Sequence, residues 1–171
     1  GGSLASLGRA FQMRTLATRN SATEHSYDVD GVDEVFPPSQ LHDMLSQADF
    51  VAITAPLTDE TRGLIGQKEL AIMKPTSYIF NVGRGPIIDQ SALIEALKNG
   101  GIAGAGLDVV EEEPLPADSE LWDLPNVVLS PHMAGGTESH GWRVADLFIQ
   151  NLQRYLEGDE LVNQLSLGKS Y

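Results

Sequence analysis

Three side chains of this 171-residue chain, Arg84, Glu113 and His132, have the types and spacing to bind a carboxylate and move a proton. Each comes shortly after an apolar, strand-like run. Ligands of parallel α/β sheets bind beyond the carboxyl ends of the strands, so these runs would bring the three side chains to one edge. A guanidinium pairs with a carboxylate through a planar fork, and histidine can change its charge near neutral pH. The set therefore predicts a site for a carboxylate ligand with an acid-base group beside it.

The immediate neighbours of these residues fit that interpretation. Arg84 stands between two glycines, and small neighbours let a ligand approach the backbone. His132 belongs to a Pro-His-x-Ala-Gly sequence, and Glu113 is the last of three glutamates before a proline. A carboxylate paired with the imidazole would favour the imidazolium and fix the ring. We assign that role to Glu113 and interpret Glu111 and Glu112 as solvated charges.

The elements that must position these residues alternate between strands and helices. This alternation predicts an α/β fold, a Rossmann-like doubly wound parallel sheet. The strand at 102–109 is rich in glycine and alanine, which predicts close backbone packing. Asp89 or Ser91 is expected to cap the fourth helix. The pattern predicts helices at 3–11, 39–47, 67–73, 92–98 and 137–156, strands at 13–17, 35–36, 50–54, 78–82, 102–109 and 127–129, and loops at 18–31 and 111–125.

Composition narrows the classes of partner. The chain has 24 acidic and 11 basic residues, a net charge of −13, which argues against nucleic acid because phosphate binding needs a basic surface. No apolar run approaches the roughly 20 residues that span a bilayer, and no leader is seen, so we expect a cytoplasmic protein without a membrane partner. The chain has no cysteine, which excludes disulfides and thiol catalysis. The acidic, lysine-poor surface fits either an ordinary acidic protein or a halophilic one.

The ordered motifs at 81–85, 107–114 and 130–136 resemble the D-isomer-specific 2-hydroxyacid dehydrogenase family, over about residues 1–156. The resemblance implies an oxidoreductase that transfers a hydride between a nicotinamide dinucleotide and a small 2-oxoacid, such as glyoxylate or hydroxypyruvate. In such an enzyme Arg84 holds the substrate carboxylate and polarises the keto oxygen, His132 supplies the proton, and Glu113 orients His132. The resemblance also implies a homodimer and no metal.

The same resemblance implies the cofactor contacts. Gly1 falls at the third glycine of the dinucleotide fingerprint, and Asp108 faces the nicotinamide. An NAD enzyme usually has an acidic residue after the second strand, about 20 residues beyond the glycines, and none stands in 18–21. Arg19 there can pair with a 2′-phosphate, so we predict NADP(H), with NAD(H) as the alternative. The full set of expected contacts is Gly1, Arg19, Asn20, Ser21, Ala55, Pro56, Thr61, Val82, Gly83, Arg84, Asp108, His132 and Gly135.

The alignment of this chain with the motifs of the family also bears on domain organisation. The first strand and the first two glycines of the dinucleotide fold do not occur in this chain, nor does the preceding substrate domain. We therefore expect residues 1–156 to form a nucleotide-binding domain without its first strand. Residues 157–171 are expected to form a tail that packs on the absent domain.

Two other functions stay open on the same fold. One is a dinucleotide-sensing, non-enzymatic binding protein of the corepressor type, because fold alone does not establish an activity. The other is oxidation of phosphite or formate. The intact set of Arg84, Glu113 and His132 favours the 2-oxoacid reductase.

Overall fold

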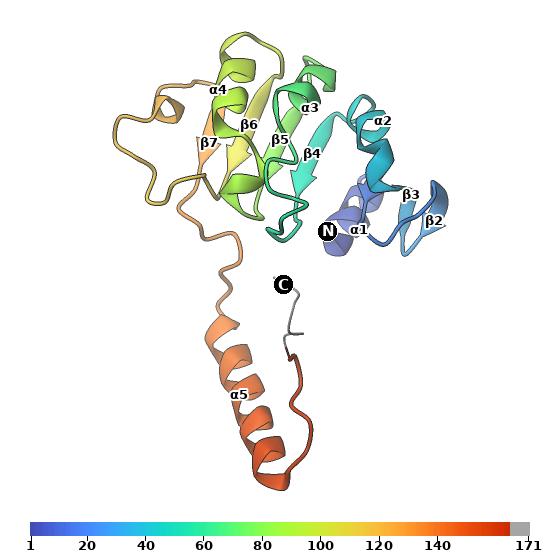
Figure 1. Cartoon of the computed structure of the whole chain (residues 1–171), viewed down its shortest axis with the longest axis vertical. Helices are drawn as coiled ribbons and strands as arrows, with labels where there is room; N and C mark the ends of the chain where they lie inside the picture. The colour runs from blue at the N-terminus through green and yellow to red at the C-terminus, as the bar shows by residue number, and fades with distance from the viewer. Residues whose placement is uncertain (165–171) are drawn as a thin grey trace.

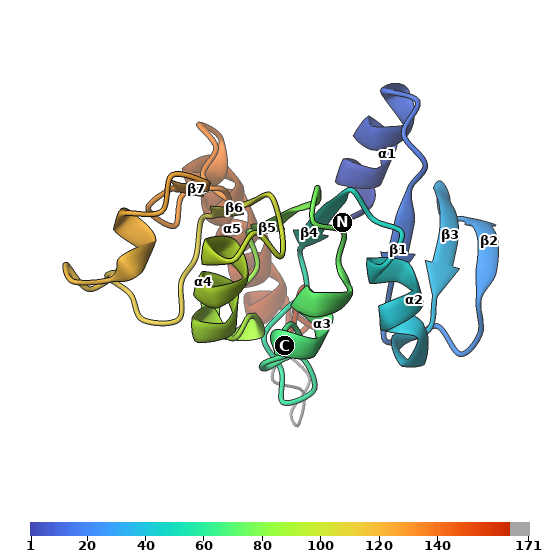
Figure 2. The ribbon, with the colours of Figure 1, turned by 90° about the horizontal axis from the view of Figure 1, so that it is seen from above.

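The computed structural model describes residues 1–164, in which the strands form two sheets (Figures 1 and 2). The larger sheet is wholly parallel, in the order β4-β5-β6-β7, and the smaller sheet has the order β1-β3-β2. Helices flank the sheets, so the expected Rossmann-like α/β class is confirmed. The strands are β1 (Leu16–Thr18), β2 (Ser26–Val29), β3 (Val32–Phe36), β4 (Phe50–Ile53), β5 (Tyr78–Asn81), β6 (Gly104–Leu107) and β7 (Val127–Leu129). The helices are α1 (Gly2–Ala10), α2 (Leu41–Leu45), α3 (Gln67–Ile72), α4 (Gln90–Lys98) and α5 (His140–Glu157), with short 3₁₀ helices η1 (Pro38–Gln40), η2 (Gly85–Ile87) and η3 (Glu120–Trp122).

The four parallel strands end in register. Ile53 pairs with Asn81, Asn81 with Leu107, and Leu107 with Leu129, so the loops that follow β4 to β7 leave from one line across the sheet. This edge is the lower one in Figure 1. The sequence places its candidate residues in the loops that follow three of these strands.

One face of the larger sheet forms the core. Residues alternate between exposed and buried along β4 and β5, and the buried set packs with α3 and α4. Asp89 caps α4, because its Oδ1 accepts the amide of Ala92 at 3.0 Å. Of the two expected caps, the structure therefore uses the aspartate. The most buried large side chains of this core include Leu45, Ile65, Leu70, Ile79, Ile87, Leu93 and Ile102.

The other face of this sheet is open and apolar. Phe50, Tyr78 and Phe80 form an aromatic row with ring centroids 5.9 and 6.4 Å apart. Gly104 and Gly106 of β6 lie beneath the rings, and a Cβ on Gly106 would come within 2.7 Å of the Phe80 ring. The predicted close packing at this glycine-rich strand is confirmed.

The smaller sheet contains an element that the sequence analysis missed. Residues 18–31 were expected to be a loop, yet Ser26–Val29 forms β2 and pairs antiparallel with β3. Asp30 and Gly31 join the two strands with φ values of 51° and 76°, the left-handed pair that a tight two-residue hairpin needs. The Val-Asp-Gly-Val sequence was the available signal, and the surrounding polar residues obscured it.

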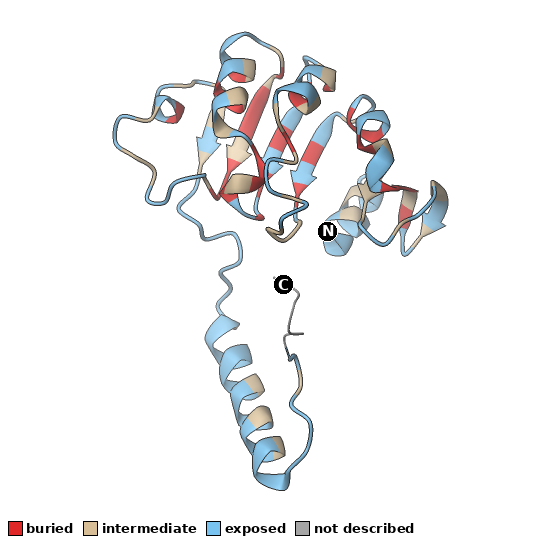
Figure 3. Ribbon diagram, viewed as in Figure 1, coloured by how far each residue is buried: buried red, intermediate tan, exposed pale blue. Residues whose placement is uncertain are grey.

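The long helix α5 projects away from both sheets (Figure 1). None of its residues is buried, and Figure 3 shows it exposed along most of its length. Its apolar side includes Trp142 and Phe148, 77% and 66% exposed. Beyond the helix, Asn151 holds the returning chain through two hydrogen bonds with the backbone of Val162. The rest of the expected tail, 165–171, lies outside the described residues. No helix in the described part of the chain has the length and hydropathy to cross a bilayer.

Candidate active site

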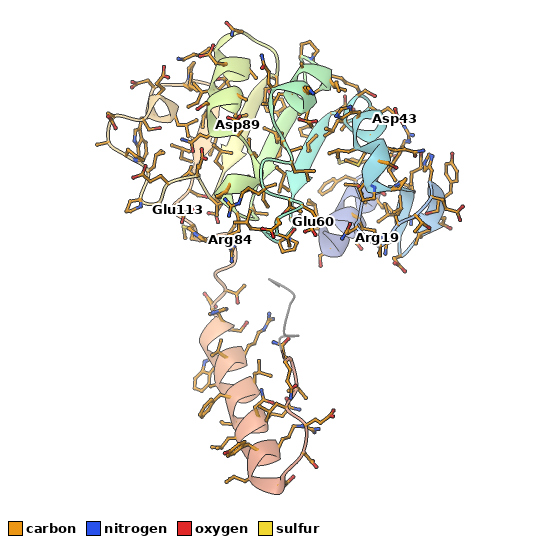
Figure 4. All side chains as sticks on the ribbon, in the orientation of Figure 1. Arg19, Asp43, Glu60, Arg84, Asp89 and Glu113 are labelled. Atoms are coloured by element: carbon orange, nitrogen blue, oxygen red, sulfur yellow. The ribbon has the colours of Figure 1, made fainter. Side chains whose placement is uncertain are left out.

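The loops after β5, β6 and β7 bring Arg84, Glu113 and His132 to the same end of the larger sheet. Figure 4 shows Arg84 and Glu113 at this lower edge, with Glu60 of the loop after β4 nearby. Arg84 lies close enough to Glu113 for its positive charge to lower the pKa of that carboxyl. The expected convergence of the three side chains is therefore present in the structure.

The turn that carries Arg84 is shaped by Asn81. Its side chain is only 1% exposed. The Oδ1 atom accepts the Gly83 amide at 3.0 Å, and Nδ2 donates to the Arg84 carbonyl at 3.0 Å. A Cβ on Gly85 would lie 1.8 Å from the carbonyl oxygen of Val110, so only glycine fits there. This contact packs the Arg84 turn directly against the start of the Glu113 loop.

The Arg84 guanidinium keeps most of its donors free. Nη1 donates to the Gly83 carbonyl at 2.7 Å, which folds the side chain over its own turn. Among the ion pairs of residues 1–164, none involves Arg84. Because a guanidinium has five N–H donors, Arg84 can still present a two-pronged face to a carboxylate.

His132 and Glu113 form a close pair. Nδ1 of His132 lies 2.7 Å from Oε2 of Glu113, and Oε1 of Glu113 accepts the Val110 amide at 3.2 Å. The hydrogen bond with His132 lowers the pKa of Glu113 despite some burial, and the Val110 amide and the charges of His132 and Arg84 lower it further. With Nδ1 facing an ionised carboxylate, Nε2 is the nitrogen left for a ligand. Of the three consecutive glutamates, Glu113 is the one that the structure pairs with His132.

Asp108 anchors the loop that carries His132. Its carboxylate accepts the Ser130 hydroxyl at 2.5 Å and the amides of Met133 and Ala134, both at 2.9 Å. Its carbonyl accepts the His132 amide at 2.9 Å. These bonds hold His132 at φ 51°, a left-handed conformation that is uncommon for a residue with a side chain. The expected approach of Asp108 to a nicotinamide stays a prediction, because its carboxylate oxygens already serve this loop.

The charge of Asp108 persists into the acid range. Burial alone would raise its pKa, but the hydrogen bonds from Ser130, Ala134 and Met133, with the nearby His132, lower the pKa below the ordinary value. A carboxyl with a depressed folded-state pKa stabilises the fold above its unfolded value, about 3.9 for aspartate. That contribution is lost only as the pH falls through the lower folded value.

We predict that Asp108→Asn releases the His132 loop. The amide group would place an N–H donor against backbone N–H groups, which leaves at least one of them without an acceptor. The amide protons of Met133 and Ala134 should then exchange with solvent at least about tenfold faster. Hydrogen exchange followed by NMR measures this, with Asp123→Asn in an exposed turn as the control. Unchanged exchange at both amides would contradict the anchoring role.

The residues expected to hold the cofactor's phosphates lie along the same edges. Gly1 precedes α1, and a Cβ there would meet the Thr54 hydroxyl at 3.1 Å. A Cβ on Gly83 would lie 2.7 Å from the Ala55 carbonyl, so the loops after β4 and β5 approach closely. A helix N-terminus next to such glycines suits an anionic phosphate. Thr61, from the same expected set, closes the loop after β4, because its hydroxyl donates to the Pro56 carbonyl at 2.7 Å.

The remaining expected contacts divide between the two sheets. Arg19 begins a turn through Asn20 and Ser21 that the Ala22 amide closes on the Arg19 carbonyl at 3.1 Å. These residues follow β1, whereas Val82 and Gly135 follow β5 and β7. The Thr18 hydroxyl, at the end of β1, is buried without a hydrogen-bond partner. Figure 4 shows Arg19 along the lower edge, apart from Arg84 and Glu113.

Three supporting residues were not predicted from the sequence. Asn81 and Ser130 hold the loops of Arg84 and His132, and Asp30 pairs with Arg19 at 2.8 Å. The position of Asn81 two residues before the Gly-Arg-Gly turn was an available signal. No local pattern predicts the other two contacts, because they join segments far apart in the chain. Among residues 1–164 no cluster of histidine and acidic side chains could hold a metal ion.

Comparisons with known proteins agree with this geometry. The sequence profile of the D-isomer specific 2-hydroxyacid dehydrogenase family, NAD binding domain, matches residues 1–134. Glyoxylate reductase of Korarchaeum cryptofilum is 41% identical over 167 residues, 96% of this chain and 49% of that protein. Glyoxylate/hydroxypyruvate reductase B of Pectobacterium carotovorum is 49% identical over 119 residues, 70% of this chain and 37% of that protein.

A solved structure shows the same fold. The D-isomer specific 2-hydroxyacid dehydrogenase from Xanthobacter autotrophicus, in complex with NADPH and MES, superposes with a TM-score of 0.83 at 34% identity. The match covers 96% of this chain and 66% of that one. The chain spans about half or less of the length of the curated relatives it matches.

Proposed function

Because this chain belongs to the D-isomer specific 2-hydroxyacid dehydrogenase family, we propose that the intact protein reduces a small 2-oxoacid, such as glyoxylate or hydroxypyruvate, with a nicotinamide dinucleotide. The reverse reaction would oxidise the D-2-hydroxyacid. The observation that carries the proposal is the 2.7 Å pair of His132 and Glu113 beside the Arg84 guanidinium, which forms no ion pair among the described residues.

The proposed mechanism assigns one task to each side chain. Arg84 binds the substrate carboxylate and draws electron density toward the keto oxygen. His132, protonated and held through Nδ1, donates the proton on Nε2 to that oxygen. Glu113 stabilises the imidazolium and keeps Nε2 pointed at the substrate. The bound cofactor supplies the hydride, so the protein contributes orientation, charge and proton transfer. In the oxidation direction His132 takes the proton back.

The residues at the sheet edges fit a dinucleotide. The α1 N-terminus and the glycines at positions 1 and 83 leave room for phosphate against backbone. The buried, unpartnered Thr18 hydroxyl and the Arg19 side chain stand where the second strand of the fold ends. Such a strand end meets the adenosine ribose in dinucleotide-binding folds.

We propose NADP(H) as the preferred cofactor, with Arg19 paired to its 2′-phosphate. Arg19→Asp is expected to lower kcat/KM for NADPH by about 10²-fold, because a carboxylate repels the phosphate. The same variant should retain most of its activity with NADH. Initial rates with glyoxylate and hydroxypyruvate, with both cofactors in parallel, measure the change. Equal losses with both cofactors would argue for a structural role of Arg19, and turnover with NADH alone in the unmodified protein would exclude the phosphate contact.

The pairing of Glu113 with His132 predicts a pH effect. The depressed pKa of Glu113 keeps it ionised below the ordinary glutamate value of about 4.3. Glu113→Gln removes this charge at every pH. At neutral pH the variant should therefore have a kcat/KM for oxoacid reduction about tenfold below that of the unmodified protein, and the difference should shrink as the pH falls through the depressed pKa of Glu113. Matched pH profiles of the protein, of Glu113→Gln and of Glu112→Gln, the neighbouring glutamate, test this, and equal rates of the unmodified protein and Glu113→Gln at neutral pH would contradict the role of Glu113.

We also propose that the protein forms a homodimer. Support comes from the open apolar sheet face around Phe50 and from the exposed apolar side of α5, since large exposed apolar patches mark interaction sites. The cytoplasmic location, the absence of nucleic-acid and membrane partners, and the two interpretations of the acidic surface stay predictions. The packing of residues 157–171 on a substrate domain likewise stays a prediction.

A further inference from the structure

Arg19, the residue proposed to bind the 2′-phosphate, is paired within the chain. Its Nη1 atom lies 2.8 Å from Oδ2 of Asp30, and the Asp30 side chain is 73% exposed. Asp30 occupies the first position of the β2–β3 hairpin turn. The hairpin turn therefore places an acidic side chain against Arg19, although none stands in 18–21.

We propose that Asp30 is a specificity-determining residue that limits the preference for NADP(H) over NAD(H). The inference rests on the proposed 2′-phosphate contact of Arg19. A bound 2′-phosphate, with a charge near −2, must share the Arg19 donors with a carboxylate already in contact with them. Like charges within a few ångströms repel, so Asp30 opposes the phosphate while it neutralises part of the attraction from Arg19.

The same carboxylate favours the cofactor that lacks the phosphate. A ribose 2′-hydroxyl can donate a hydrogen bond to an acidic side chain, which is the usual basis of NAD selection. In this chain the acid comes from the hairpin turn instead of from the end of the strand. Arg19 can thus bind a 2′-phosphate, and Asp30 can accept a hydrogen bond from a 2′-hydroxyl.

The turn geometry allows a conservative variant. Asp30 has φ 51°, and asparagine adopts left-handed conformations as readily as aspartate in such turns. Asp30→Asn therefore removes the charge and preserves the hairpin. Asp28 offers a matched control, because it lies two residues earlier, also has φ 51°, and faces Arg9 at 3.5 Å instead of Arg19. Asp28→Asn removes the same charge from the same hairpin.

The test uses titration calorimetry on the intact protein with two probes, adenosine 2′,5′-bisphosphate and adenosine 5′-monophosphate. Asp30→Asn is expected to bind the bisphosphate about three- to tenfold more tightly at low salt, with less than a twofold change for the monophosphate. High salt should shrink the gain, because it screens exposed charges. Asp28→Asn should stay within about twofold of the unmodified protein for both probes. The ratio of kcat/KM for NADPH to that for NADH should rise with the bisphosphate affinity.

The other outcomes overturn the inference. Equal gains in Asp30→Asn and Asp28→Asn would show a general charge effect, and weaker bisphosphate binding in Asp30→Asn would show that Asp30 mainly orients Arg19. Arg19→Ala distinguishes a wrong role for Asp30 from a wrong NADP(H) assignment. If Arg19→Ala binds the bisphosphate as the unmodified protein does, the NADP(H) assignment fails and the inference with it. If Arg19→Ala weakens bisphosphate binding and Asp30→Asn does not strengthen it, only the role of Asp30 is wrong.

Discussion

Replacing His132 by glutamine is expected to lower kcat for 2-oxoacid reduction by about 10²- to 10⁴-fold, the usual contribution of a positioned general acid. Glutamine retains a polar group of similar reach but cannot supply a proton as an imidazolium can. The cofactor dissociation constant should change little, because the proton goes to the substrate. Single-turnover rates at saturating substrate measure the loss directly, since they separate the chemical step from product release.

His140→Gln provides the matched control for this variant. His140 is an exposed histidine at the start of α5, eight positions along the chain, and it has no side-chain partner among the described residues. The expected result is a kcat close to that of the unmodified protein. A full kcat in His132→Gln, or an equal loss in the His140 variant, would remove His132 from the proton path.

The second large effect is expected at Arg84. Arg84→Gln removes both the charge and the fork that bind a carboxylate, and should lower kcat/KM for the oxoacid by about 10²- to 10³-fold. Most of this loss should appear as an increase in the KM for the oxoacid. Arg84→Lys restores a charge without the planar fork, so it should recover only part of the loss. Steady-state kinetics with glyoxylate at saturating cofactor provide the measurement.

The turn itself should survive these Arg84 variants. The hydrogen bonds of the Asn81 side chain go to the backbone of positions 83 and 84, not to the guanidinium. A loss of activity with an unchanged melting temperature therefore reports the side chain. Arg62→Gln, in the loop after β4, serves as the control and should keep the oxoacid KM within about twofold. An unchanged KM in Arg84→Gln would show that another group binds the carboxylate.

Much of this fold was predictable because its signals are local. Apolar runs such as those around Ile53 and Ile79 end at polar or glycine residues, and the alternation of strands with helices over most of the chain favours a parallel sheet. The candidate site was predictable for the same reason, since parallel strands in register place the residues that follow them on one line. Asn81, Leu107 and Leu129 form that line in the structure.

The parts that escaped prediction depend on contacts between distant segments. β2 is a short polar strand, and its pairing with β3 depends on a two-residue turn more than on hydrophobic alternation. The contact of Ser130 with Asp108 joins two loops 22 positions apart, and no local spacing encodes it. Asp30 lies in the turn of a hairpin within residues 18–31, which were interpreted as a loop. The contacts of Ser130 and Asp30 arise only when the fold brings distant segments together, so residue type alone gave no sign of them.

The backbone at His132 illustrates how the fold maintains the site. A left-handed conformation at a residue with a side chain costs roughly 1 kcal/mol or more. Three hydrogen bonds to the Asp108 carboxylate and one to its carbonyl hold the loop in that conformation. The imidazole is thereby directed toward Glu113, and the general acid is positioned before any substrate arrives.

The most direct test of a 2-oxoacid reductase follows the hydride itself. The intact protein would be incubated with hydroxypyruvate and NADPH deuterated at the transferable position of the nicotinamide, and the product examined by mass spectrometry and chiral chromatography. We expect glycerate of the D configuration with one deuterium at C2, formed in proportion to the NADPH consumed. Tight cofactor binding without deuterated hydroxyacid, across a panel of 2-oxoacids, would contradict it and favour a protein that senses the dinucleotide without turning it over.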